Sequence, residues 1–217
     1  MDNRLQVGFG RVDITPDFPV GLGGYDNPEK RVHTAVRDHI YMTCVAFADT
    51  EKTILVFTLD NCACAPFLAD RLRGFVTEAT GIDGTHQFYG ATHSHSCPSV
   101  YASEKSGGVL YNALLDRSAP EAAKLALADL SPATVFAGNE TIEGLAYVRH
   151  YILKDGTNAE LRKHDVSELA GHPAEADKTM VLVKFAREGK KDVLLVNWHA
   201  HPDHSSSLDP ELPRRSA

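Results

Sequence analysis

The chain has 217 residues, 43% of them hydrophobic and 24% charged, which is typical of one large globular domain or two small ones. Its formal net charge of -7 argues against nucleic acid as the main partner, because binding to phosphates requires clustered Lys and Arg. The sequence has neither an apolar run of about 18 residues nor the apolar region of a signal peptide. We therefore expect no transmembrane segment and a cytoplasmic location, unless a leader has been removed.

The first half of the chain alternates between β-rich runs and one helical pattern. Two β-rich runs separated by four turn-forming residues, 49–52, predict a hairpin. Apolar residues at helical spacing, including Phe67 and Phe75 on the apolar face, predict a helix that Gly81 ends. In chain order, we expect strands at residues 5–14, 41–48 and 53–59, a helix at 66–80 and a strand at 86–92.

The second half predicts a further helix and more strands. Pro120 is expected to divide the helical pattern at residues 110–130 or to start its second part, because proline interrupts helices. Polar residues 162–176 predict a loop, and Asp155 with Gly156 predicts a turn. The expected strands are 133–142, 145–153 and a hairpin of 179–186 with 193–198.

These elements predict an α/β fold in which helices cover a mixed β-sheet, a layered α/β/α-like arrangement. We expect a domain at residues 1–204 and a disordered tail at 205–217, because the tail has little apolar content. Since an apolar strand lies so near the end of this domain, the fold is expected to be an incomplete catalytic domain.

Glycines and cysteines add two local features. Residues 21–25, GLGGY, form a loop in which glycine permits a positive φ or a close backbone approach. The loop lacks the strand-turn-helix context of a phosphate loop, so nucleotide binding has little weight. Cys62 and Cys64 are expected on one strand face, where a soft metal is conceivable. Buried free thiols are the favoured interpretation, because cysteine is so often simply buried.

The motif His93-Ser94-His95 follows the apolar strand expected at residues 86–92. If the strand continues, both histidines project from the same face, because side chains two residues apart on a strand do so. Neutral imidazoles are good zinc ligands, and the ends of strands are where sites of α/β proteins collect. The alternative is a pair of histidines on an exposed strand end.

A second motif has the same design. The apolar run 193–198 leads into His199-Ala200-His201-Pro202, and His204 follows. Two such strand ends in one domain could bring three or four imidazoles together, although one pair could be a surface feature. The repetition of the design favours a shared metal site.

The order of several motifs resembles the N-terminal part of the neutral/alkaline ceramidase family, from Gly8 to Pro202. The opening run GFGRVDITP at residues 8–16 is similar to the first strand and turn of that family. Further similar motifs are Gly24-Tyr25, Leu59-Asp60, the run 92–96, the run 147–150 with 154–156, and the run 197–202.

The resemblance implies a zinc-dependent amidohydrolase acting on a small-molecule or lipid-like amide such as an N-acyl sphingosine. It implies that His93 and His201 are zinc ligands and that His95 transfers protons beside the metal. It also implies that Arg149 stabilises the substrate oxygen, the alternative being a surface salt bridge. Asp60 could orient a ligand imidazole or cap a strand end, and His199 is expected beside the site.

The sequence departs from the family in one important respect. The family completes its zinc site with a Glu and a Tyr well downstream of the second motif, and this chain ends 15 residues after Pro202. Either His95, His199 or His204 supplies a third ligand, or the chain is a fragment. Val148, where the family commonly has Asn, is a milder departure. The alternative function is therefore a metal-binding or interaction module without catalysis, and a homo-oligomer or heteromer could supply the remaining ligands.

Overall fold

The structure is a computed structural model that describes residues 5–25, 27–146, 148, 150–160, 166–172, 174–202 and 211–212. The described residues fall into two compact units. The first contains residues 1–134, 185–193 and 202–217, and the second contains residues 135–184 and 194–201.

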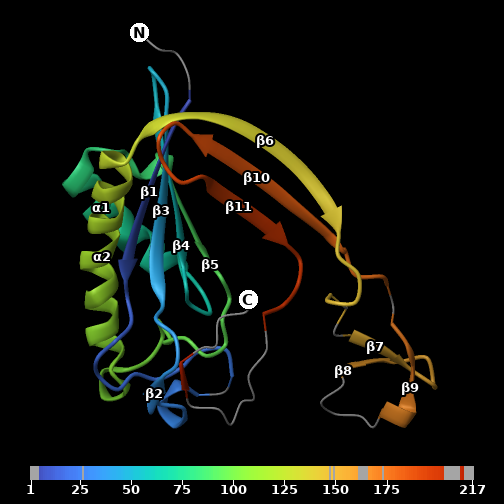
Figure 1. Cartoon of the computed structure of the whole chain (residues 1–217). Helices are drawn as coiled ribbons and strands as arrows, with labels where there is room; N and C mark the ends of the chain where they lie inside the picture. The colour runs from blue at the N-terminus through green and yellow to red at the C-terminus, as the bar shows by residue number, and fades with distance from the viewer. Residues whose placement is uncertain are drawn as a thin grey trace. The chain divides into compact units, whose positions relative to one another are not determined.

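Seven strands form a mixed sheet in the order β11-β10-β6-β1-β3-β4-β5 (Figure 1). Antiparallel pairing joins β1 to β3 and β3 to β4, whereas β4 and β5 are parallel. The predicted α/β class with a mixed sheet is therefore confirmed. The strands are β1 (Gln6–Asp13), β3 (Tyr41–Ala48), β4 (Thr53–Leu59), β5 (Gln87–Ala91), β6 (Ser131–Thr141), β10 (Thr179–Arg187) and β11 (Val193–Trp198).

Two smaller sheets complete the described strands. One pairs β2 (Ala35–Val36) in parallel with β12 (Glu211–Leu212), which lies in the tail predicted to be disordered. The other contains β7 (His150–Leu153), β8 (Asn158–Glu160) and β9 (Leu169–Gly171) in the order β8-β7-β9. Short 3₁₀ helices occur at Pro28–Lys30, Gly84–His86, Glu104–Ser106 and Val166–Glu168.

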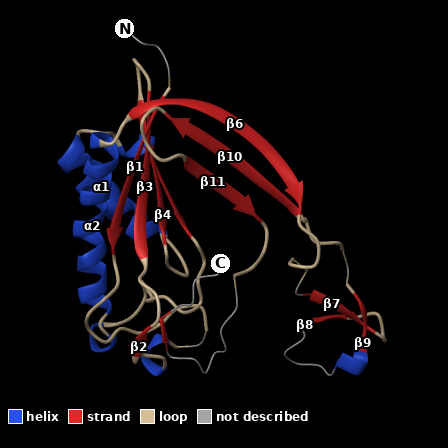
Figure 2. Cartoon of the chain, viewed as in Figure 1, coloured by secondary structure: helices blue, strands red, loops and turns tan. Residues whose placement is uncertain are grey.

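Helices α1 (Pro66–Thr80) and α2 (Gly108–Ala128) lie on the same side of β1, β3 and β4 (Figure 2). Their buried side chains share one core with the facing sides of β3 and β4, because alternate strand residues point to one face. This core contains Met42, Cys44 and Ala46 of β3, Leu55, Phe57 and Leu59 of β4, Leu68, Leu72 and Val76 of α1, and Tyr111, Leu115, Ala119, Ala122, Ala123 and Ala126 of α2. None of the described helices is long and apolar enough to cross a membrane.

Several predicted elements are confirmed and others need correction. The hairpin of β3 and β4 and the bounds of α1 match the prediction, and Gly81 ends α1 with φ 76°. Phe67 and Phe75 are partly exposed rather than buried, because Leu68, Leu72 and Val76 form the inner face. Pro120 does not divide α2, which continues through it.

Two predictions for the second unit are wrong in part. The strand expected at 145–153 begins only at His150, since residues 142–146 are not in a strand. The segment expected to be a loop at 162–176 contains the short strand β9, which pairs with β7. The polar composition of this segment did not predict the strand, because β9 is stabilised by its pairing with β7 and has no apolar pattern of its own.

Candidate metal centre

The candidate centre lies at the end of a strand-helix-strand unit formed by β4, α1 and β5. Because β4 and β5 are parallel neighbours, with Leu59 opposite Ala91, their carboxyl ends lie at the same edge of the sheet. The amide of Thr92 continues this pairing by donating to the carbonyl of Leu59 over 2.9 Å. The two segments that follow these strands are thereby brought together, as is usual for sites of α/β proteins.

His93 and His95 lie close together, but for a different reason from the one predicted. The strand ends at Ala91, so alternation along a strand does not align the two side chains. Instead, His93 has a φ of 62°, the left-handed region that non-glycine residues rarely adopt. This turn places Nε2 of His93 3.3 Å from Nε2 of His95. Such a conformation persists where surrounding contacts enforce it, which is common at functional sites.

The spacing of the two Nε2 atoms fits a shared metal ion. Two nitrogen ligands at zinc bond lengths of about 2.0–2.1 Å around a tetrahedral ion lie about 3.4 Å apart. The observed separation of 3.3 Å is close to this value. His95 is buried and His93 is exposed, so the pair lies at the boundary between the core and solvent. The residues present therefore fit zinc.

Cys62 lies with these histidines, a grouping that the sequence did not reveal, since a buried free thiol was the favoured interpretation of this residue. One donor atom of each of Cys62, His93 and His95 lies within 4.8 Å of the others, a grouping that could bind a metal ion. Cys62 and Cys64 do not share a strand face as predicted, because β4 ends at Leu59 and both follow it. Both thiols are free and partly buried, and this burial raises their pKa.

The backbone of Cys62 also orients the His93 ring. Nδ1 of His93 lies 2.6 Å from the carbonyl oxygen of Cys62. A carbonyl oxygen only accepts hydrogen bonds, so Nδ1 carries the proton and donates it. Nε2 of His93 is then left with a lone pair, directed at His95. A ring N–H bonded to a carbonyl is the usual support of a metal-binding histidine.

The glycine-rich loop packs against the other side of His95. The amide of Gly23 donates to the carbonyl of Cys97 over 2.8 Å, which joins this loop to the segment after His95. Gly24 has a φ of 93°, and a Cβ there would lie 2.4 Å from Cγ of His95. The predicted positive φ and close approach are thus both confirmed at Gly24. The rings of His95 and Tyr25 also form a T-shaped pair, with their centroids 4.9 Å apart.

Arg31 is a second residue that the sequence did not reveal. Its buried guanidinium donates from Nη1 and Nη2 to the carbonyl of His95, each over 3.3 Å, and from Nη1 to the carbonyl of Gly23 over 3.2 Å. The guanidinium also lies 4.9 Å from the centre of the Tyr25 ring, a cation–π arrangement. Arg31 therefore links the glycine loop to the backbone of His95.

Asp60 has the contacts of a strand-end cap. Its carboxylate accepts from the amide of Tyr41 over 2.9 Å, and its own amide donates to the carbonyl of Tyr41 over 2.9 Å. These bonds close the open end of the β3–β4 hairpin. The capping alternative is thus observed, and orientation of a ligand imidazole by Asp60 stays a prediction.

The second histidine motif lies in the other unit. Strand β11 ends at Trp198, so His199 and His201 are not on a continuing strand as the prediction required. Nε2 of the exposed His199 lies 3.7 Å from a carboxylate oxygen of Asp177, and His201 is partly buried. The proposed pairing of His201 with His93 stays a prediction. Arg149 and His204 lie outside the described residues.

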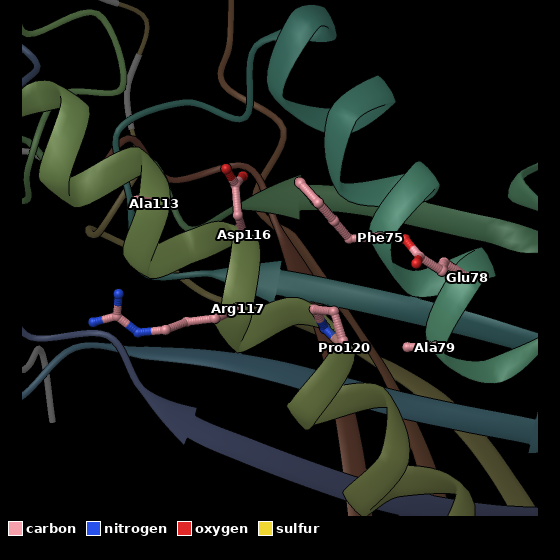
Figure 3. A pocket seen from close by; sticks show the side chains of 7 residues that line it. All are labelled: Phe75, Glu78, Ala79, Ala113, Asp116, Arg117 and Pro120. Atoms are coloured by element: carbon pink, nitrogen blue, oxygen red, sulfur yellow. The ribbon is translucent and has the colours of Figure 1, made fainter.

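A separate hollow of about 580 Å³ lies between α1 and α2 (Figure 3). Figure 3 shows Asp116, Arg117 and Pro120 along α2, with Phe75 and Glu78 on α1 across from them. The lining residues are Phe75, Glu78, Ala79, Ala113, Asp116, Arg117 and Pro120, none of which is a histidine or cysteine. The side chains of Cys62, His93 and His95 are therefore not part of this hollow.

The arrangement of strands and helices is similar to that of solved ceramidase structures. A neutral ceramidase from Pseudomonas aeruginosa matches with a TM-score of 0.71 and 16% identity, over 93% of this chain. The chain shares the fold of a part of this neutral ceramidase. A ceramidase complexed with C2 matches with a TM-score of 0.70 and 18% identity, over 92% of this chain. No family model and no curated protein matches the sequence.

The match covers only part of neutral ceramidase. This chain spans 32% of the length of each of the two solved chains. At 16–18% identity, the likeness establishes the fold alone. The resemblance to the ceramidase family expected from the motifs is therefore supported at the level of the fold.

Proposed function

We propose that this chain carries part of the active site of a metal-dependent amide hydrolase of the ceramidase type. The observation that carries the proposal is the pair of Nε2 atoms of His93 and His95, 3.3 Å apart at the carboxyl end of β5. Such a pair is suited to a zinc ion, and the fold in which it occurs is similar to that of neutral ceramidase.

The proposed roles follow from the chemistry of each side chain. His93 binds the metal through Nε2, because its Nδ1 proton is engaged with the carbonyl of Cys62. His95 is the residue next to it that can move a proton to or from the water or the leaving amine. His201 is proposed as a further ligand and Arg149 as the group that stabilises negative charge on the substrate oxygen. A bound zinc ion supplies a Lewis acid and an activated water at neutral pH.

The proposed substrate is a lipid-like amide. Both similar structures are ceramidases by name, so an N-acyl sphingosine is the first compound to test. Compounds of this class share an amide bond. Assays on a series of substrates would measure how turnover depends on the length of the acyl chain.

Zinc analysis and an amidase assay on the same preparation test the proposal. The purified chain is expected to contain zinc and to release fatty acid from a fluorescent short-chain ceramide. Changing His93 or His95 to Ala should lower both zinc content and turnover. His86→Ala is the matched control, because His86 immediately precedes β5 at its opposite end. Wild-type protein that lacks both zinc and turnover would contradict the proposal.

A second candidate function is a metal-binding module without catalysis. The thiol of Cys62 beside the two histidines favours it, because thiolate ligands are most common in structural zinc sites. Zinc retained in wild type, lost in His93→Ala, and accompanied by no turnover of any amide tested would select this alternative.

A further inference from the structure

The thiol of Cys62 lies beside both histidines of the candidate centre. Its Sγ atom is 3.9 Å from Nδ1 of His93, the nitrogen that donates to the Cys62 carbonyl, and one donor atom from each of the three residues falls within 4.8 Å of the others. Cys64, two residues further along the same loop, is also partly buried but does not belong to this group. The two cysteines therefore form a natural pair of test and control.

We propose that Cys62, His93 and His95 together bind one zinc-like cation, with the Cys62 thiolate as the third protein ligand. This inference rests on the metal centre of the proposed function, and it makes His95 a ligand in place of the proton-transfer role proposed there. Three protein ligands with one open position is the composition of catalytic zinc sites. Binding releases the thiol proton to solvent, because the metal ligand is the thiolate.

Contacts on both sides fix the backbone around Cys62. The preceding residue, Asn61, is fully buried, and its side-chain oxygen accepts from the Tyr111 hydroxyl over 2.6 Å. On the other side, a Cβ at Gly23 would lie 3.1 Å from Cβ of Cys62, so the loop backbone packs closely on this side chain. The fold therefore fixes the backbone at Cys62 before any metal binds.

The remaining adjustment needed for binding lies in the side chain of Cys62. At zinc bond lengths of about 2.3 Å to sulfur and 2.0–2.1 Å to nitrogen, sulfur and nitrogen ligands lie about 3.6 Å apart. One donor atom of each residue already lies within 4.8 Å of the others, so Sγ must come closer to the histidine nitrogens, and rotation about the side-chain torsion of Cys62 is what moves it. The two histidines, 3.3 Å apart at Nε2, need almost no movement.

The chemistry of the donors selects the class of cation. One thiolate and two imidazoles favour zinc, cobalt or copper(I) over magnesium and calcium, which prefer oxygen ligands. The inference therefore predicts that excess magnesium does not displace zinc from the chain.

Cobalt substitution and zinc X-ray absorption test the ligand set directly. The metal-free chain titrated with Co²⁺ is expected to show a near-ultraviolet thiolate-to-cobalt charge-transfer band. Cys62→Ser should abolish the band and weaken zinc binding at least about tenfold, whereas Cys64→Ser should retain both. X-ray absorption of the zinc-loaded wild type should show one sulfur at about 2.3 Å, and this measurement needs no variant.

The outcomes separate this inference from the proposed function. Zinc bound only through nitrogen and oxygen, or equal zinc affinity in wild type and Cys62→Ser, would overturn the role of Cys62, even if amide hydrolysis is observed. A zinc–sulfur contact without hydrolysis of any amide would support the ligand set and reject the hydrolase. Melting curves of both serine variants identify any loss of folding.

Discussion

The backbone of Gly24 is in direct contact with the side chain of His95. A Cβ at position 24 would lie 2.4 Å from Cγ and 2.6 Å from Cβ of His95, distances at which one of the two residues must move. The φ of Gly24 is 93°, a conformation that also disfavours any side chain. The orientation of His95 therefore depends on the absence of a side chain in the neighbouring loop.

We predict that Gly24→Ala weakens zinc binding at least about tenfold, because the new methyl group displaces a ligand imidazole. Gly81→Ala is a matched control: Gly81 has a φ of 76°, and a Cβ there would meet nothing within 4 Å. It should lose about 1–2 kcal/mol of stability from backbone strain and retain zinc affinity. Competition titration with a chelating dye measures the affinities, and equal losses in both variants would refute the role of the contact.

Arg31 is predicted to support the centre without binding metal. Arg31→Lys keeps the charge but loses the pair of hydrogen bonds that Nη1 and Nη2 donate to the carbonyl of His95. Zinc affinity is therefore expected to fall by about tenfold. The control is Arg73→Lys, since Arg73 forms a local pair with Asp70 on the surface of α1. Calorimetric titration with zinc compares them, and unchanged affinity in Arg31→Lys would show that the contact is only structural.

Local sequence patterns predicted the elements around the site well. Residues 66–80 were recognisable as a helix because their apolar spacing is helical and Gly81 supplies a left-handed end. The loop at residues 21–25 was recognisable because glycines permit the conformation that Gly24 adopts. Both signals are contained within a few consecutive residues.

The members of the centre could not be grouped in this way. Cys62 and His93 are 31 residues apart, and Arg31 contacts a carbonyl 64 residues away. Composition does not encode such contacts, which follow from strand order. One signal in the sequence was the strand-helix-strand pattern over residues 53–91. This pattern predicts two parallel neighbouring strands whose carboxyl ends lie at the same edge of the sheet. From that pattern, Cys62 could have been placed near the histidines.

Asp129 is predicted to make stability depend on acidic pH. Its carboxylate accepts from the guanidinium of Arg187, from Nζ of Lys190 and from the amide of Phe9. Burial alone would raise the pKa of Asp129, but these donors outweigh it and lower the pKa to about 2 from 3.8. A lowered folded-state pKa gives a stabilisation that is present above about pH 4 and is lost as the pH falls to about 2.

Asp129→Asn is therefore expected to cost about 1–2 kcal/mol at pH 7, allowing for solvent screening, and much less near about pH 2. Asp70→Asn is the control, because the Asp70 carboxylate is exposed in its pair with Arg73 and should matter by less than about 0.5 kcal/mol. Urea unfolding at both pH values measures the difference. A cost in Asp129→Asn that does not shrink in acid would contradict the assigned ion pairs.

Pro120 offers a test of strain within α2. Proline in a helix interior has no N–H to donate and its ring crowds the preceding turn, yet α2 is continuous through this position. Pro120→Ala is expected to stabilise the chain by about 1–3 kcal/mol, less the contacts of the ring that lines the hollow between the helices. Glu121→Ala, at the exposed neighbouring position, should change stability by less than about 0.5 kcal/mol. Chemical denaturation compares the two variants, and destabilisation by Pro120→Ala would mean that packing of the ring outweighs the missing hydrogen bond.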